Sequence, residues 1–160
     1  AKDNSDDFKE TLRDNLIQNE KTDKELLDML VRDQVIELEA EKLGLAVTVE
    51  EAAANLENTY AQMQQSLESS DPDERKSAET VLQILRTYQE GLGVSDQEFR
   101  EQYQVPVIRR AMTQTKLYRK FYDELPEETQ KDVKLCRIKF EEYISSLLEK
   151  HKIEILTNVQ

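Results

Sequence analysis

The stretch LLDMLVRDQVIELEAEKLGL, residues 26–45, decides the fold class of this chain of 160 residues. Its apolar residues recur at steps of three and four, and further apolar residues widen the stripe: Leu27, Leu30, Val31, Val35 and Leu38, then Leu26, Met29, Ile36, Ala40 and Leu43. So wide a stripe predicts a core helix with neighbours on more than one side, in which Leu30 and Leu38 are buried. Gly44 is expected to end this helix, because glycine readily takes the left-handed conformation that follows many helices. The rest of the chain is expected to pack around it.

The composition favours a few long helices. Hydrophobic residues make up 38% of the chain and charged residues 35%, and there is no Trp, so the apolar supply is thin for a spherical core. Three Gly and three Pro leave few places for turns. A chain of this length can bury a core without disulfides or a metal ion. We therefore expect one elongated, all-α domain.

Helix-start signals divide this expected domain into three parts. A narrow apolar stripe predicts a peripheral helix within residues 1–22: Phe8, Leu12 and Leu16. The main helical body is expected over residues 23–125. Three Ser/Thr-x-x-Glu capping boxes mark helix starts: Thr22 with Glu25, Thr48 with Glu51, and Ser95 with Glu98. Residues 126–160 are expected to form a returning C-terminal helix and a tail.

Residues 48–91 are expected to form a long helical hairpin. Two apolar stripes flank the short turn Ser-Ser-Asp-Pro at residues 69–72, and so short a connection favours antiparallel helices. The first stripe consists of Ala52, Leu56, Tyr60, Met63 and Leu67. The second consists of Ala78, Val81, Leu82, Leu85 and Tyr88.

Two more amphipathic helices are expected after the hairpin. The first starts near Pro106, which favours the first turn of a helix, and its stripe is Ile108, Ala111, Met112, Thr115, Tyr118, Phe121, Tyr122 and Leu125. The stripe of the closing helix is Val133, Cys136, Phe140, Tyr143, Ile144, Leu147 and Leu148. This strong stripe predicts that the closing helix packs back on the body. Residues 152–156, KIEIL, alternate between polar and apolar, which predicts a short terminal strand.

The charge of the chain limits its partners. A formal net charge of −12 argues against binding to nucleic acid or to an anionic bilayer surface, since both repel an acidic protein. Basic partners are compatible with this charge, although charge on helix faces usually serves solubility. No stretch approaches the roughly 18 consecutive apolar residues of a membrane span.

The sequence offers no set of residues typical of catalysis. It has one His, His151, at the polar end of the closing helix, and one Cys, Cys136, beside an apolar stripe. Gly91 and Gly93 lack the further glycines and the Lys-Ser/Thr pair of a phosphate-binding loop. There is no Glu-x-x-His pair for a diiron centre and no calcium-loop pattern. We therefore expect a protein that is not an enzyme, with no catalytic residues, no metal site and no cofactor.

Soft and amphipathic side chains on the long helices are the candidates for binding. Such residues are common on adaptable binding surfaces, and we assign polypeptide binding to Tyr60, Met63, Leu67, Tyr118, Phe121 and Tyr122. Stripes of this kind are more often core, so both interpretations stay open. The residues favour a non-enzymatic interaction module.

The order of these motifs resembles a known family. Residues 26–56, LLDMLVRDQVIELEAEKLGLAVTVEEAAANL, resemble the N-terminal signature of the SurA and PrsA group of extracytoplasmic chaperones. Residues 91–103, GLGVSDQEFREQY, and the following helix IRRAMTQTKLYRKF at 108–121 resemble the family's next segments. Residues 140–156, FEEYISSLLEKHKIEIL, look like its closing helix and small terminal strand.

The resemblance implies a helical cradle, completed by the returning helix, that holds unfolded or exported polypeptides by apolar contacts. It also implies an extracytoplasmic location, periplasmic or as a cell-surface lipoprotein, and the start at Ala1 suits a removed signal segment. Membrane contact is then expected only through a lipid anchor upstream, and a homodimer is compatible with this class.

Two departures from the family limit what it implies. The hairpin is longer than usual, and residues 125–139 are far too few for the parvulin-type prolyl isomerase domain expected there. Isomerase activity is therefore not carried over. The alternative is a structural or adaptor protein that uses the same fold to bind one specific folded partner or to self-associate.

Overall fold

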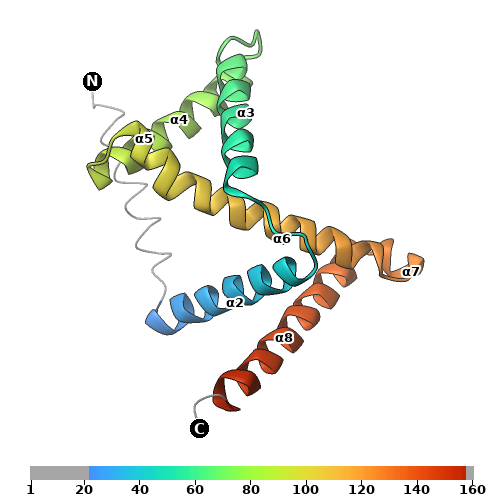
Figure 1. Ribbon diagram of the computed structural model, residues 1–160. Coiled ribbons are helices and arrows are strands. Elements are labelled where there is room, and N and C mark those ends of the chain that lie inside the picture. The colour runs from blue at the N-terminus through green and yellow to red at the C-terminus, as the bar shows by residue number, and fades with distance from the viewer. Residues whose placement is uncertain (1–21, 158–160) are drawn as a thin grey trace.

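The computed structural model describes residues 22–157, and every regular element within them is a helix (Figure 1). The elements are α2 (Asp23–Lys42), α3 (Val49–Leu67), α4 (Pro72–Leu92), α5 (Asp96–Glu98), the π-helical segment η1 (Phe99–Gln104), α6 (Val105–Asp123), α7 (Glu127–Gln130) and α8 (Val133–Thr157). The prediction of an elongated all-α fold is confirmed. The predicted peripheral helix with Phe8, Leu12 and Leu16 lies outside the described residues.

Local hydrogen bonds start and end these helices as the sequence predicts. All three capping boxes form: Thr22, Thr48 and Ser95 accept the backbone N–H of the Glu three residues later, at 3.3, 3.1 and 3.2 Å. Each Glu carboxylate accepts the backbone N–H of its capping residue in return. Gly44 follows α2 with a φ of 69°, the left-handed conformation that glycine adopts without strain.

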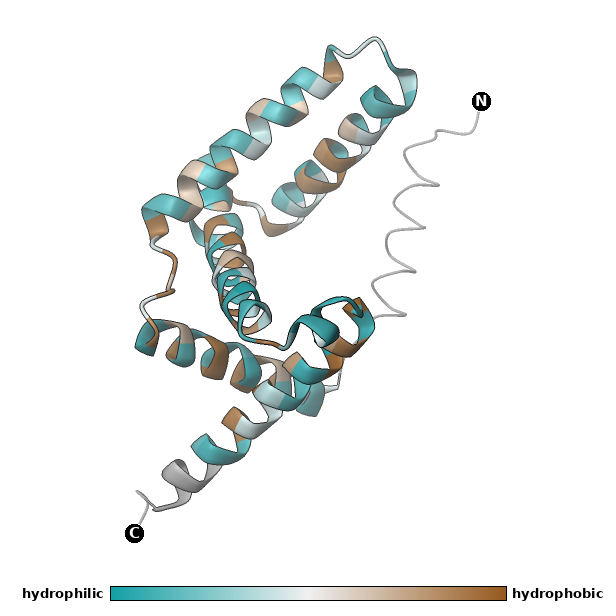
Figure 2. Cartoon of the chain, turned by 90° about the vertical axis from the view of Figure 1, so that its right-hand side faces the viewer, coloured by the Kyte–Doolittle hydropathy of each residue, from teal (hydrophilic) through white to brown (hydrophobic). Residues whose placement is uncertain are grey.

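Helix α6 organises the molecule, which corrects the prediction that residues 26–45 do so. It crosses the middle of Figure 1 and contacts α2, α3, η1 and α8. The hairpin of α3 and α4 stands at one end of α6, whereas α2 and α8 pack toward the other (Figure 2). The predicted long hairpin and returning C-terminal helix are confirmed.

Two apolar clusters form the core, and α6 contributes to both. The larger cluster joins α2, α6 and α8 and contains Val35, Ile36, Leu117, Phe140, Ile144 and Leu147. The smaller cluster joins the base of the hairpin to the start of α6 and contains Val47, Ala52, Leu56 and Val105. The buried Thr113 hydroxyl accepts the backbone N–H of Val47 at 3.2 Å and so fixes the link between α2 and α3 against α6.

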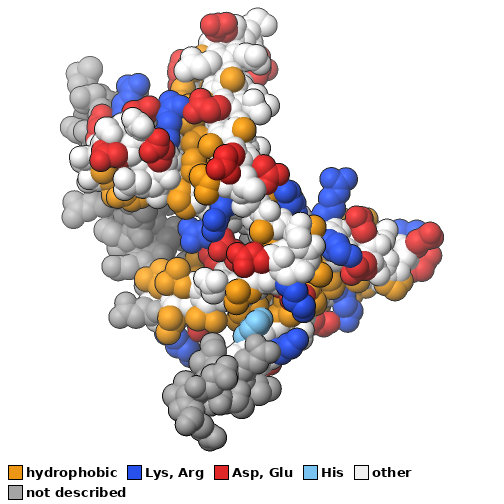
Figure 3. All heavy atoms as spheres, viewed as in Figure 1, with side chains coloured by type: hydrophobic (Ala, Val, Ile, Leu, Met, Phe, Trp, Pro, Cys, Tyr) orange, Lys and Arg blue, Asp and Glu red, His pale blue; other side chains and the backbone are white. Residues whose placement is uncertain are grey.

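Helix α2 is a core helix over its C-terminal half only. Val35 and Ile36 are each 3% exposed, but Leu30 is 60% and Leu38 40% exposed. The prediction that Leu30 and Leu38 are buried is therefore wrong. The buried face of α2 consists of Val35, Ile36, Glu39 and Ala40. Leu30 lies in the turns before it, and Leu38 lies off this face. Figure 3 shows hydrophobic side chains at the surface over this part of the molecule.

The predicted terminal strand at residues 152–156 is also wrong, because α8 continues as a helix to Thr157. A strand needs a neighbouring strand to pair its backbone groups, and the described part of the chain contains none. Continuing the helix pairs those groups within the segment itself.

Candidate functional site

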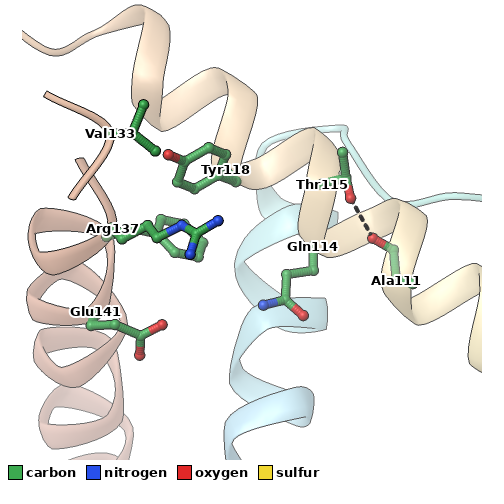
Figure 4. Close-up of a pocket in the computed structure, with 8 residues that line it drawn as sticks. Ala111, Gln114, Thr115, Tyr118, Val133, Arg137 and Glu141 are labelled. Carbon is green, nitrogen blue, oxygen red and sulfur yellow. Dashed lines mark hydrogen bonds between the residues drawn. The ribbon is translucent and has the colours of Figure 1, made fainter. Parts of the chain in front are cut away.

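An open groove of about 730 Å³ lies between α6 and α8, beside the core. We call it the α6–α8 groove, and its lining residues are Ala111, Gln114, Thr115, Tyr118, Val133, Arg137, Phe140 and Glu141 (Figure 4). The first four belong to α6 and the last four to α8. The groove thus exists because the returning helix lies against the organising helix at an angle that leaves space between them.

Aromatic contacts form the floor of the groove. The ring of Tyr118 meets Phe140 edge to face, with centroids 5.0 Å apart and an angle of 87° between the planes. Aromatic pairs favour this geometry. Val133, at the start of α8, is 64% exposed and extends the apolar surface at the mouth. The groove therefore offers an aromatic base and an exposed aliphatic edge.

Two shallower hollows continue the groove on either side. A hollow of about 350 Å³ toward α3 shares Ala111 and Thr115 with it. Another, of about 530 Å³ along α8, shares Arg137 and Glu141 and adds the exposed Ile138. The shared residues place the three hollows next to one another in a row from α8 across α6 to α3, and we call this row the track.

Ion pairs hold the walls of the track together. Arg32 of α2 donates to both carboxylate oxygens of Glu141 on α8, at 2.7 and 3.0 Å. At the other end, Lys116 of α6 binds Glu51 of α3 at 3.2 Å. The pKa of Glu51 lies below its usual value, mainly because the backbone N–H of Thr48 donates to its carboxylate and then because of Lys116. Both carboxylates therefore have a basic partner on a neighbouring helix.

One predicted binding residue of the later helix, Tyr118, lines the groove. Phe121 instead packs on Phe140 and Tyr143, with centroid distances of 5.5 and 5.1 Å, so it supports the core. The hydroxyl of Tyr122 donates to the backbone oxygen of Gln130 at 3.2 Å and fixes α7.

The three predicted binding residues of the hairpin lie elsewhere. Tyr60 packs on the smaller cluster, its hydroxyl donates to Gln104 at 3.1 Å, and Arg100 lies 4.1 Å above its ring. Met63 and Leu67 are half-buried further along α3. Neither they nor Tyr60 line the α6–α8 groove, so the structure does not bring the six predicted residues into one site.

Sequence reasoning missed Gln114, Val133, Arg137 and Glu141 as lining residues. Val133 belongs to the apolar stripe of the closing helix, and its place at the very start of that helix was the available signal that it is exposed. Arg137 and Glu141 are charged residues on a charged helix, and nothing in their spacing sets them apart from a solvated face.

Another polar contact joins α8 to α2 beside the core. The hydroxyl of Tyr143 donates to Glu39 at 3.0 Å, and Glu39 is only 8% exposed. Burial raises the pKa of Tyr143 to about 12, helped by the hydrogen bond to Glu39 and by the negative charges of Glu39 and Glu124. A phenol with so high a pKa stays protonated at neutral pH and can donate to Glu39, so this pair joins α2 to α8.

The described residues were also compared with the requirements of metal sites and membrane spans. Within residues 22–157 no group of three or more His, Cys, Asp or Glu side chains is placed to hold a metal ion. No helix in that range combines the length and the apolar character needed to cross a membrane. Comparisons with protein-family models, curated proteins and solved structures found no match for this chain.

Proposed function

We propose that this chain binds and holds unfolded or exported polypeptides, as a SurA/PrsA-like chaperone without prolyl isomerase activity. The observation that carries the proposal is the track, a row of neighbouring open hollows from α8 across α6 to α3. A track that is open along its length suits a chain that passes through it, whereas small ligands are usually enclosed in a pocket.

The chemistry of the track supports an unspecific polypeptide ligand. Tyr118 and Val133 offer aromatic and aliphatic surface to side chains of many shapes, with the buried Phe140 behind them. Exposed apolar surface beside polar groups is typical of interaction sites. The net charge of −12 keeps copies of the protein apart while apolar clients are bound, because like charges repel.

The proposed location and partners follow from the resemblance to the SurA and PrsA group. The protein would act outside the cytoplasm, periplasmic or as a lipoprotein, on exported chains, with no nucleic-acid partner and no cofactor. A lipid anchor upstream would be its contact with the membrane.

The test compares two exposed valines. Val133 lies in the groove and is 64% exposed, whereas Val107, near the start of α6, is 55% exposed and does not line it. Light scattering would follow the aggregation of several unrelated denatured proteins with and without the chain. We expect Val133→Ser, and more strongly Tyr118→Ser, to reduce suppression of aggregation, while Val107→Ser leaves it unchanged. Suppression of no client, or equal loss in all three variants, would contradict the proposal.

The exposed leucines of α2 favour a second candidate, an adaptor that binds one folded partner or itself. Leu26, Leu27 and Leu30 are 47%, 60% and 60% exposed and lie outside the track. Leu27→Ser combined with Leu30→Ser would separate the candidates. Loss of a single tight complex in a pull-down, in a protein that suppresses no aggregation, would favour the adaptor.

A further inference from the structure

Three polar side chains converge on the α6–α8 groove without a protein partner. The guanidinium of Arg137, the carboxamide of Gln114 and the hydroxyl of Tyr118 all line it. Among the described residues none of the three has a hydrogen-bond or ion-pair partner. Figure 4 shows Arg137 extending from α8 into the space toward Gln114 and Tyr118 of α6. These groups are placed to bind something that enters the groove.

The charge inside the groove is positive. Of its two charged lining residues, Glu141 is neutralised by Arg32, which binds both of its carboxylate oxygens. Arg137 has no carboxylate within ion-pair distance among the described residues. The groove thus pairs an apolar floor with one uncompensated cation.

The chemistry of that cation selects its ligand. A guanidinium presents a planar set of N–H donors that matches the two oxygens of a carboxylate, and it has no acceptor. The carboxamide of Gln114 both donates and accepts, so it suits the backbone of an extended chain. Together they fit a polypeptide segment with an acidic side chain beside apolar ones.

The negative net charge of the whole protein does not prevent an acidic segment from binding at Arg137. Residues 49–104, which include the hairpin, contain twelve Asp or Glu and four Lys or Arg, whereas α6 contains five basic residues and one acidic residue. The base of the hairpin lies beside the track, where Lys116 of α6 pairs with Glu51 of α3, and the rest of the hairpin extends away from α8 (Figure 1). Glu51 at this base is paired with Lys116, and charges further away than the Debye length, about 8 Å at physiological salt, are largely screened from Arg137.

We propose that Arg137 forms a carboxylate subsite in the groove, so that the chain prefers client segments in which Asp or Glu flanks apolar residues. The inference rests on the proposed function and names the class of client. The carboxylate comes from a side chain within the client and not from its C-terminus. The reason is that the track continues beyond Arg137 in both directions, toward Ile138 on α8 and toward α3.

The test uses labelled peptides that share the same apolar residues and differ at one central position, Glu, Gln or Lys, with blocked termini. A fourth peptide has Gln at that position and a free C-terminal carboxylate. Fluorescence anisotropy measures their affinities for the full chain at moderate salt. We expect the Glu peptide to bind about fivefold more tightly than the Gln peptide. Arg137→Gln should abolish this preference, and Arg137→Lys should keep part of it.

Arg119 provides the matched control. It is an exposed arginine of α6 that does not line the groove, so Arg119→Gln removes the same charge and should leave the preference for Glu intact. Equal affinity for the Glu and Gln peptides would overturn the subsite while the proposed function stands. Preference for the free C-terminus would overturn the choice of an internal side chain. If none of the peptides binds, and Tyr118→Ser leaves the suppression of aggregation unchanged, the proposed function itself fails.

Discussion

The two halves of α2 both carry apolar residues, but those of the first half are exposed and most of those of the second half are buried. In the first half, residues 23–34, Leu27 and Leu30 are each 60% exposed. In the second half, residues 35–42, Val35 and Ile36 are 3% exposed and Ala40 is fully buried. Both halves carry apolar residues at helical spacing, and the helix is continuous between them.

The difference lies in what the rest of the chain places beside each half. The second half lies against Leu117 of α6 and Ile144 of α8 in the larger core cluster. Among the described residues, the first half forms ion pairs with other helices near its C-terminal end. Arg32 pairs with Glu141 of α8, and Asp33 pairs with Arg110 of α6. The width of the apolar stripe therefore indicates how many helices can pack on a helix. Segments distant in sequence decide how many of them do.

The largest effect is expected from Ile36→Ala in the buried half. The side chain packs in the larger cluster, so truncation leaves a cavity and removes buried apolar surface. We expect the free energy of unfolding to fall by about 2–5 kcal/mol, measured by urea denaturation. A loss below about 1 kcal/mol would mean that this cluster is loosely packed and that the two halves differ less than their exposure indicates.

A smaller effect is expected from the polar contact of the same half, between Glu39 and Tyr143. The folded state raises the pKa of Tyr143 to about 12, above the value of about 10 in an unfolded chain. The folded state therefore holds the phenol proton more tightly, and this contribution to stability is fully present below pH 10. It is lost as the pH rises from about 10 to about 12.

The measurement is the free energy of unfolding as a function of pH over that range. We expect a steeper fall in the natural chain than in Tyr143→Phe, which has no phenol proton to lose. Tyr88→Phe, at an exposed tyrosine of α4, is the control and should leave the slope unchanged. If the free energy of unfolding falls equally steeply with pH in all three proteins, the contact between Tyr143 and Glu39 does not stabilise the buried half of α2.

The features that could be predicted from sequence depend on residues close together in the chain. A capping box needs two residues three positions apart, and all three were predicted correctly, at Thr22, Thr48 and Ser95. The hairpin depends on a short turn with Asp71 and Pro72, which cap and start α4. Such signals decide helix boundaries whatever the tertiary contacts are.

The features that were missed depend on long-range placement. The role of α6 as organiser follows from contacts with segments on both sides of it in sequence, which no local pattern records. The end of α8 alternates like a strand, but without a pairing strand in the described chain it stays helical. Arg137 became part of a candidate site because α8 returns beside α6 at that point, not because of its neighbours in sequence.

The smallest effect is expected from Leu30→Ala in the exposed half, and it is the sharpest test of the comparison. Leu30 is 60% exposed, so truncation removes little buried surface, and Ala favours helix at least as well as Leu. We expect the free energy of unfolding to change by less than about 0.5 kcal/mol in urea denaturation. The measurement should be repeated over a range of protein concentrations. A loss that grows with concentration would mean that a second copy covers this leucine, which would favour self-association through the exposed half of α2. A loss as large as that of Ile36→Ala at every concentration would instead mean that the two halves are equally buried, and the contrast between them would not hold.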